Sequence, residues 1–223
     1  MSDVILEAKG IQKSFGGVMA VAGVDLTIRR GEIFALIGPN GAGKTTIFNL
    51  ISGTHPLDQG QIIFEGHLIH GLASHRIAAG GLVRTFQNLQ IFNAMTVIEN
   101  VMVGRHLRSR TGFLAAALRL PGVAAEERLT REKALEFLTL VGLEARANDT
   151  AASLPFGQQR LLEIARALAA EPKMLMLDEP AAGLTRPEIE ALDGLIWRIR
   201  QGGLTVLLVE HDMNLVMGIA DRV

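Results

Sequence analysis

Apolar residues follow two spacings along this chain, and the two spacings alternate. Short runs that are apolar at nearly every position, or at every second one, predict strands at 4–9, 24–28, 33–38, 61–64, 82–86, 173–178 and 205–210. Apolar residues three or four positions apart predict helices at 44–52, 130–141, 158–170 and 186–200. Several of the strands are apolar on both faces, so they belong inside a covered sheet. The sequence therefore predicts an α/β fold with a mainly parallel core.

The middle of the chain departs from this alternation. From about residue 95 to residue 170 there is no convincing strand, and an arginine-containing stretch, GRHLRSRTGFLAAALRLPG, interrupts the helices. We expect a mostly helical subdomain at about 87–170, inserted into one α/β domain whose core lies at about 1–86 and 171–223.

Composition excludes several classes of protein. The chain has 223 residues, 48% of them hydrophobic, which is enough for a sizeable core. Lys and Arg number 22 and Asp and Glu 23, so a net charge of −1 gives no general attraction for nucleic acid. There is no cysteine for a disulfide framework. An acidic residue near the start argues against a secretory signal, and no apolar run approaches the roughly 18 residues of a membrane span.

The stretch IFALIGPNGAGKTTIF carries the most specific motif. Gly38, Gly43, Lys44 and Thr45 satisfy G-x-x-x-x-G-K-[ST] between a buried strand and a helix, the context that distinguishes a phosphate-binding loop from an ordinary glycine-rich turn. Glycines let the backbone wrap phosphates closely. Lys44 supplies positive charge, the helix adds its dipole, and Thr45 can bind Mg²⁺. The residues that we expect to bind the phosphates are Gly38, Pro39, Asn40, Gly41, Ala42, Gly43, Lys44, Thr45 and Thr46.

A pair of acids follows another buried strand, in KMLMLDEP. Asp178 would lie at the carboxyl edge of the sheet, where a phosphate-binding enzyme of this class holds Mg²⁺, and Glu179 could deprotonate the attacking water. Acidic residues are common at strand ends, so this pair alone does not indicate catalysis. The presence of the phosphate-binding loop is what favours a catalytic role. Gln87 and His211 are unremarkable in isolation.

Taken in order, these residues resemble the nucleotide-binding subunit of an ABC transporter, and the resemblance covers essentially the whole chain. It implies ATP and Mg²⁺ as cofactors and an N-terminal antiparallel β region. Phe15, in KSFGGVMAV, would stack on adenine, although the family more often has tyrosine. Gln87, in RTFQN, would reach Mg²⁺ and the attacking water, and His211, in VEHD, would contact the γ phosphate.

The resemblance also predicts a function for the stretch LPFGQQR. The family's usual signature is Leu-Ser-Gly-Gly-Gln, and it meets the γ phosphate held by a second subunit, which assigns Leu154, Gly157 and Gln158 to that contact. Here Pro155 replaces the serine, and proline offers neither a hydroxyl nor an N–H. The alternative is a proline-led helix start with no ligand. Thr185, in AAGLT, stands where an interface aspartate is usual.

The strings RTFQNLQIF, MTVIENVMVG and VEHDMNLVMGIADRV look most like the LivG-type ATPases of branched-chain amino acid importers. The resemblance implies a head-to-tail dimer, permease subunits at the cytoplasmic face of the inner membrane, and a solute-binding protein. Relatives serving urea, amides or other solutes share nearly the same ATPase. The family usually continues after DRV with a C-terminal segment, which this sequence lacks.

Two other classes are weighed against a transporter. A soluble ABC ATPase of DNA repair or of the ribosome would be expected to show tandem cassettes, a coiled-coil insertion or a strongly basic face, and a regulatory nucleotide sensor would be expected to lose Glu179. For a transporter, four apolar residues near Gln87 could line a permease docking groove or could be core: Phe86, Leu89, Ile91 and Phe92.

Overall fold

A computed structural model gives the fold of the chain, and it describes residues 3–85, 89–108, 123–210 and 213–223. The strands are β1 (Val4–Phe15), β2 (Val18–Arg29), β3 (Ile33–Leu36), β4 (Gln59–Phe64), β5 (His67–Leu68), β6 (Leu82–Arg84), β7 (Met174–Asp178) and β8 (Thr205–Val209). The α-helices are α1 (Lys44–Ile51), α2 (Ser74–Ala79), α3 (Val97–Gly104), α5 (Val123–Val141), α6 (Phe156–Leu168), α7 (Arg186–Gln201) and α8 (Met213–Ile219). Three short 3-10 helices are η1 (Arg105–Arg108), η2 (Glu144–Arg146) and η3 (Ala151–Ser153).

The chain forms two compact units. The first consists of Met1–Gln87, Lys173–Ala182 and Ile189–Val223, and the second of Asn88–Pro172 and Gly183–Glu188. The first unit is therefore assembled from segments on both sides of the second in the sequence.

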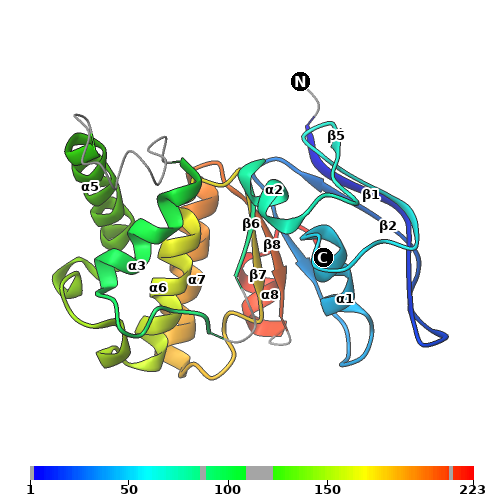
Figure 1. The fold of residues 1–223 in the computed structure, drawn as a ribbon. Helices are drawn as coiled ribbons and strands as arrows, with labels where there is room; N and C mark the ends of the chain where they lie inside the picture. Colours follow the sequence, from blue (N-terminus) through cyan, green and yellow to red (C-terminus); the bar gives the residue numbers. More distant parts are fainter. Residues whose placement is uncertain (1–2, 86–88, 109–122, 211–212) are drawn as a thin grey trace. The chain divides into compact units, whose positions relative to one another are not determined.

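Two four-stranded sheets make up the β structure of the first unit (Figure 1). One has the order β2-β1-β4-β5 with antiparallel pairing, and the other has the order β3-β8-β7-β6 with parallel pairing. The predicted α/β class, with a mainly parallel sheet and an N-terminal antiparallel region, is confirmed. Strands β1 and β2 run further than their patterns predict, because Gly10 and Gly23 have φ of +56° and +72° and shift the register instead of ending the strands.

Helix α1 shares its core with both sheets. Ile47, Phe48 and Ile51 are buried in the same cluster as Ile62 of the antiparallel sheet and Leu207 of the parallel sheet. Each large apolar side chain buried in this way contributes about 1.5–3 kcal/mol, and truncating Phe48 to alanine would cost about 3–5 kcal/mol. The core fixes the helix whose first residue is Lys44.

Strands β7 and β8 lie at the centre of the parallel sheet, and all five residues of each are buried. Burial on both faces explains their continuous apolar runs. Their register pairs Asp178 with Val209, so the residues that follow both strands begin at one carboxyl edge.

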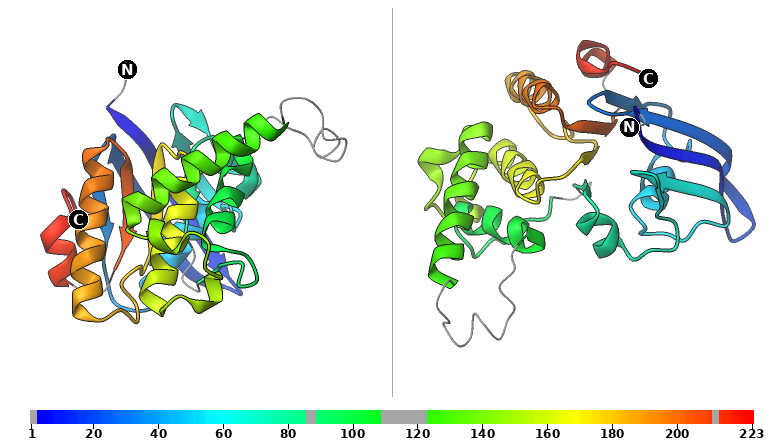
Figure 2. Two further views of the ribbon diagram at one scale, coloured as in Figure 1. Left: turned by 90° about the vertical axis from the view of Figure 1, so that its left-hand side faces the viewer. Right: turned by 90° about the horizontal axis from the view of Figure 1, so that it is seen from above.

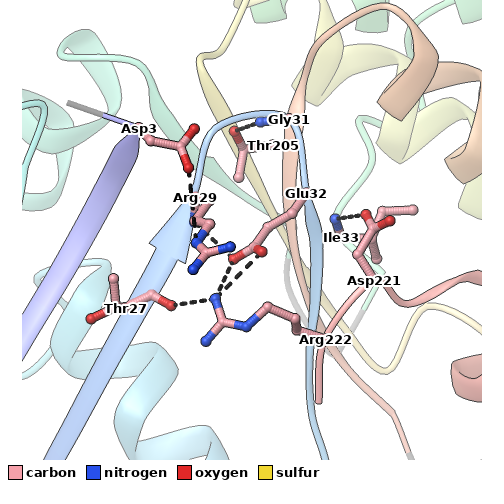
Figure 3. Close-up of polar contacts among 9 residues, drawn as sticks. All are labelled: Asp3, Thr27, Arg29, Gly31, Glu32, Ile33, Thr205, Asp221 and Arg222. Atoms are coloured by element: carbon pink, nitrogen blue, oxygen red, sulfur yellow. Dashed lines mark hydrogen bonds and ion pairs between the residues drawn. The ribbon is translucent and has the colours of Figure 1, made fainter. Parts of the chain in front are cut away.

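The C-terminal residues hold the strand that leads into the phosphate-binding loop (Figure 3). Asp221 Oδ2 accepts a hydrogen bond from the N–H of Ile33 at 2.8 Å. Arg222 Nη1 donates to Glu32 Oε1 at 3.0 Å and to the Thr27 carbonyl at 3.1 Å. These contacts fix the start of β3 against the chain end.

The second unit is helical in its described residues, with α3, α5 and α6 in mutual contact (Figure 2). A capping box between Thr96 and Glu99 starts α3, and a Cβ on Gly104 would overlap the backbone carbonyl of Arg166, so glycine permits the close approach of α3 to α6. In its described residues, this unit has no strand beyond an isolated bridge between Thr96 and Thr150. None of the described helices in either unit has both the length and the apolarity needed to cross a bilayer.

Candidate functional site

The predicted phosphate-binding loop connects β3 to α1. Gly38, Gly41 and Gly43 have φ of +151°, +82° and +94°, conformations that other residues rarely adopt. A Cβ on Gly43 would come within 2.5 Å of the Ala20 carbonyl oxygen on β2, so only glycine fits between the loop and that strand. The backbone thus leaves β3 in a tight wrap and enters the helix at Lys44.

Lys44 is buried at the start of α1, and its ammonium group lies over the loop. The Nζ atom donates to the Gly38 carbonyl at 2.6 Å and to the Pro39 carbonyl at 3.0 Å. These two hydrogen bonds therefore fix the Lys44 ammonium group relative to the loop. Thr45 and Thr46 follow in the first turn of α1, with Thr45 exposed and Thr46 half-buried.

Asp178 ends β7 with its side chain 1% exposed, and Arg84 on β6 is its ion-pair partner at 2.8 Å. Arg84 also donates to Asn49 Oδ1 at 2.6 Å and Ser52 Oγ at 3.2 Å on α1 and just beyond it. One guanidinium thus connects two strands with the helix of the phosphate-binding loop. The sequence did not lead us to predict a role for Arg84. An arginine within an apolar strand, shortly before Gln87, is nevertheless a pattern that indicates a functional cation.

Glu179 adopts a φ of +47°, which is uncommon for a residue with a side chain and is typical of functional loops. Its N–H donates to the Val209 carbonyl at 2.9 Å. Glu210, also missed by the sequence analysis, is buried just after β8 and accepts from the N–H of Ala181 at 2.8 Å. The loop after Asp178 is therefore held to the end of β8.

Phe15 ends β1, and the residue is 44% exposed. The strand that follows it, β2, supplies the Ala20 carbonyl against Gly43. The structure therefore brings the predicted adenine-stacking residue, the phosphate-binding loop, Asp178 and Glu179 into one unit. Gln87, His211 and Phe86 lie outside the described residues.

The LPFGQQR stretch begins α6 in the second unit. Leu154 is buried, Pro155 stands at the N-cap without a side-chain cap, and Phe156 is 47% exposed as the first helical residue. Gln158 Oε1 accepts a hydrogen bond from Arg146 Nη1 at 3.1 Å. The stretch is therefore a helix N-terminus whose backbone donors receive no side-chain cap.

The segment that contains Thr185 borders this N-terminus within the second unit. The N–H and hydroxyl of Thr185 donate to Glu188 Oε2 at 2.8 Å and 2.7 Å. These two hydrogen bonds lower the pKa of Glu188, and the bond from the hydroxyl has the larger effect. A Cβ on Gly157 would overlap the Glu188 carboxylate, so the two loops touch. Thr185 thus orders the start of α7, a position where aspartate and threonine are both favoured.

Of the apolar residues predicted near Gln87, Phe92 is 45% exposed, whereas Leu89 and Ile91 are half-buried. Arg166 lies over the Phe92 ring, with its Cζ atom 5.4 Å from the ring centroid. Asn100 accepts from the N–H of Phe92 at 2.8 Å and donates to its carbonyl at 3.1 Å. Phe92 is thus presented at the surface on a fixed backbone.

Residues 21–182 match the family model described as ABC transporter. The matched region contains the phosphate-binding loop, the LPFGQQR stretch and the Asp178–Glu179 pair. The chain belongs to the ABC transporter family, as one of its ATP-binding, ATP-hydrolysing cassettes. The resemblance stated from the sequence is thereby confirmed.

Curated relatives narrow the comparison to importer subunits. The high-affinity branched-chain amino acid transport ATP-binding protein BraF of Pseudomonas aeruginosa is 46% identical over 224 residues, which cover 100% of this chain and 88% of BraF. The corresponding protein LivG of Escherichia coli is 44% identical with the same coverage.

Solved structures agree with this fold. The ADP conformation of an ATP-binding cassette of an ABC transporter aligns with a TM-score of 0.85 at 33% identity, covering 99% of this chain and 86% of that one. A dimeric cassette in a post-hydrolysis state, bound to ADP and Pi, aligns with a TM-score of 0.80 at 26% identity, covering 96% of this chain and 91% of that one.

Proposed function

We propose that this chain hydrolyses ATP to power the uptake of branched-chain amino acids through a membrane permease. The observation that carries the proposal is the similarity over the whole chain to BraF and LivG, whose names assign them to branched-chain amino acid transport. The family alone does not define the solute, because the ATPase subunit is not expected to touch it.

ATP would bind along the first unit. Phe15 offers a half-exposed ring for adenine, and the backbone from Gly38 to Gly43 would surround the phosphates, followed by Thr45 and Thr46 on the helix. Lys44 would exchange its two carbonyl contacts for phosphate oxygens, since an ammonium bonds more strongly to an anion than to a neutral oxygen. The N-terminus of α1 adds its positive dipole end.

The residues at this site fit a magnesium ion. Asp178 is buried at the carboxyl edge of the sheet, and Thr45 is exposed in the first turn of α1. Among the described residues, no three His, Cys, Asp or Glu side chains gather to hold a metal alone, which suits an ion held by a few protein oxygens and by the nucleotide. Thr45, Asp178 and Gln87 would hold the ion, which would neutralise phosphate charge when bound.

Hydrolysis would depend on three side chains beyond the loop. Glu179 would take the proton of the attacking water, and the hydrogen bond from its backbone N–H to the Val209 carbonyl holds its backbone at the end of β8. His211 would hold the γ phosphate, and Gln87 would sense it. In the sequence, His211 follows β8 and Gln87 follows β6, and both strands run parallel to β7.

A second copy or a related cassette would complete each site. Leu154, Gly157 and Gln158 would face the γ phosphate bound to the partner, so that two ATP molecules lie between two chains. The dimeric relative bound to ADP and Pi supports this arrangement. Pro155 lacks both the hydroxyl and the N–H of the usual serine, so at least one hydrogen bond to the phosphate is lost and we expect the dimer to be weak without the permease.

The second unit, with the segment at about 87–170, would act as the helical subdomain that docks a permease at the cytoplasmic face of the membrane. The fixed, exposed Phe92 beside Arg166 is the best placed of the predicted contacts. A solute-binding protein would act through that permease, and nucleic acid has no role in this account.

The proposal is tested by rebuilding the transporter in lipid vesicles from this chain and the permease and binding proteins encoded beside it. Internal ATP should drive uptake of labelled leucine, isoleucine and valine, and a Lys44→Ala chain should not support uptake. Uptake of a different solute, with none of these three transported, would contradict the proposed substrate but not the ATPase.

A further inference from the structure

The Phe15 ring is supported from two directions within the first unit. Its centroid lies 5.4 Å from that of the His55 ring in an edge-on contact with an interplanar angle of 72°. The Nζ atom of Lys13 lies 5.5 Å from the Phe15 centroid. Edge-on ring pairs and cations near an aromatic face both stabilise a defined ring position. Phe15 is nevertheless 44% exposed, so part of the residue is available to a ligand.

Asp58 holds the strand end that carries Phe15. Its Oδ1 accepts from Lys13 Nζ at 2.6 Å, and its Oδ2 accepts from the N–H of Ser14 at 2.8 Å. Its own N–H donates to the Gln12 carbonyl at 3.1 Å. The hydrogen bond from the Lys13 ammonium lowers the pKa of Asp58 the most, and the bond from the Ser14 N–H lowers it further. One residue thus clamps three consecutive positions of β1 next to Phe15.

Side chains two residues apart on a strand share a face, so Lys13 and Phe15 both point toward the loop that carries His55 and Asp58. This loop follows α1, the helix that begins at Lys44. The hairpin that carries Phe15 also contacts Gly43 through Ala20. The ring is therefore fixed relative to the phosphate-binding loop through both ends of α1.

We propose that Asp58, Lys13 and His55 are positioning residues that hold the Phe15 ring as a preorganised platform for the base of the nucleotide. This inference rests on the proposed ATP site. Preorganisation matters because a ring that must be ordered on binding spends part of the stacking free energy on that ordering. The three residues contribute to recognition of the base through Phe15 and not to recognition of the phosphates.

The test compares ATP with inorganic tripolyphosphate, which has the phosphate chain but no base. The preference for ATP over tripolyphosphate measures the contribution of the nucleoside, and calorimetry with displacement titrations gives it for each variant. Phe15→Ala should lower this preference about 5- to 100-fold. Asp58→Ala and Lys13→Met should lower it at least about threefold, as a part of the stacking effect, and Asp58→Asn should lose less because it keeps an acceptor.

Asp25→Ala is the matched control. Asp25 is a carboxylate of the same hairpin that accepts from the N–H of Gly10 at 2.7 Å. Its removal should leave the preference for ATP unchanged, and thermal unfolding verifies that each variant is folded. If Asp58→Ala does not fold, Lys13→Met tests the same clamp.

The outcomes separate this inference from the proposed function. An unchanged preference in Asp58→Ala and Lys13→Met, together with a loss in Phe15→Ala, overturns the positioning role and leaves the ATP site intact. An equal loss of tripolyphosphate and ATP affinity in Asp58→Ala also overturns it, because the clamp would then act on the whole site. An unchanged preference in Phe15→Ala overturns the adenine platform itself.

Discussion

Arg84 donates to Asp178 at 2.8 Å across two neighbouring strands, and their side chains are only 10% and 1% exposed. A carboxylate buried to this extent needs a cation or several donors. The same guanidinium bonds to Asn49 and Ser52, so the charge that balances Asp178 is itself tied to the helix of the phosphate-binding loop. The proposed magnesium ligand is therefore positioned before any nucleotide binds.

Replacing Arg84 with methionine should lower the free energy of unfolding by about 3–5 kcal/mol, because it leaves a buried charge without its partner. The Arg84→Met/Asp178→Asn double variant should lose less than the sum of the two single losses, with a coupling of at least about 1 kcal/mol. Urea denaturation measures all four proteins of this cycle. If the losses of the two single variants add up to the loss of the double variant, the ion pair itself contributes nothing to stability.

Lys44→Ala should weaken ATP binding at least tenfold, or about 1.4 kcal/mol, because it removes the ammonium group that lies over the loop. Titration calorimetry with Mg-ATP measures this loss. Lys133→Ala is a suitable control, since Lys133 pairs with Glu136 on the exposed face of α5. Equal affinities in the two variants would refute the phosphate-binding role.

The Thr185–Glu188 cap should give a pH-dependent contribution to stability. A folded-state pKa below the ordinary 4.5 means that the contribution is fully present above that value and is lost as pH falls through the folded-state pKa. The difference in Tm between the natural chain and Glu188→Gln should therefore be largest near neutral pH and should shrink in acid. Thr185→Ala should behave in the same way, and a difference that stays constant down to about pH 3 would contradict the cap.

Pro155→Ser should strengthen the ATP-dependent dimer in a Glu179→Gln background, by about tenfold in the dissociation constant, because it restores a hydroxyl and an N–H at the start of α6. Sedimentation velocity in Mg-ATP measures the change. Ser153→Ala is the control, because that hydroxyl already donates to the Thr150 carbonyl at 2.8 Å. A dimer that is no stronger with serine would mean that this helix end does not face the partner's phosphate.

Gly157 lies against the Glu188 carboxylate, and this contact determines which substitution can test its role. An aspartate there would add a charge and would also displace Glu188, because even a Cβ overlaps that carboxylate. Gly157→Ala in a Glu188→Ala background removes the overlap, and any remaining loss of the dimer then reports on the helix end itself. A dimer restored to full strength would assign the glycine a packing role only.

Local patterns in the sequence were sufficient for the fold class and for the order of strand, glycine-rich loop and helix around Lys44. The glycines, Lys44 and the flanking strand and helix are contiguous, so short-range chemistry specifies them. The full lengths of β1 and β2 could not be predicted, because Gly10 on β1 and Gly23 on β2 looked like strand ends, whereas the strands continue past them with shifts of register. Hydrogen bonds between residues far apart in the sequence could not be predicted either. Arg84 and Asp178 are 94 positions apart, and Asp58 and Ser14 are 44 positions apart. Only the packing of the strands brings such pairs together.

The proposed hydrolysis of ATP depends above all on the carboxylate of Glu179. Phosphate release and calorimetry should be measured for the natural chain, for Glu179→Gln and for a Glu190→Gln control on α7. We predict that Glu179→Gln binds Mg-ATP with an affinity within about threefold of the natural chain, while its turnover falls at least about a hundredfold, because an amide keeps the shape but cannot take the proton. Turnover equal to that of the Glu190→Gln control, with ATP bound, would contradict the account.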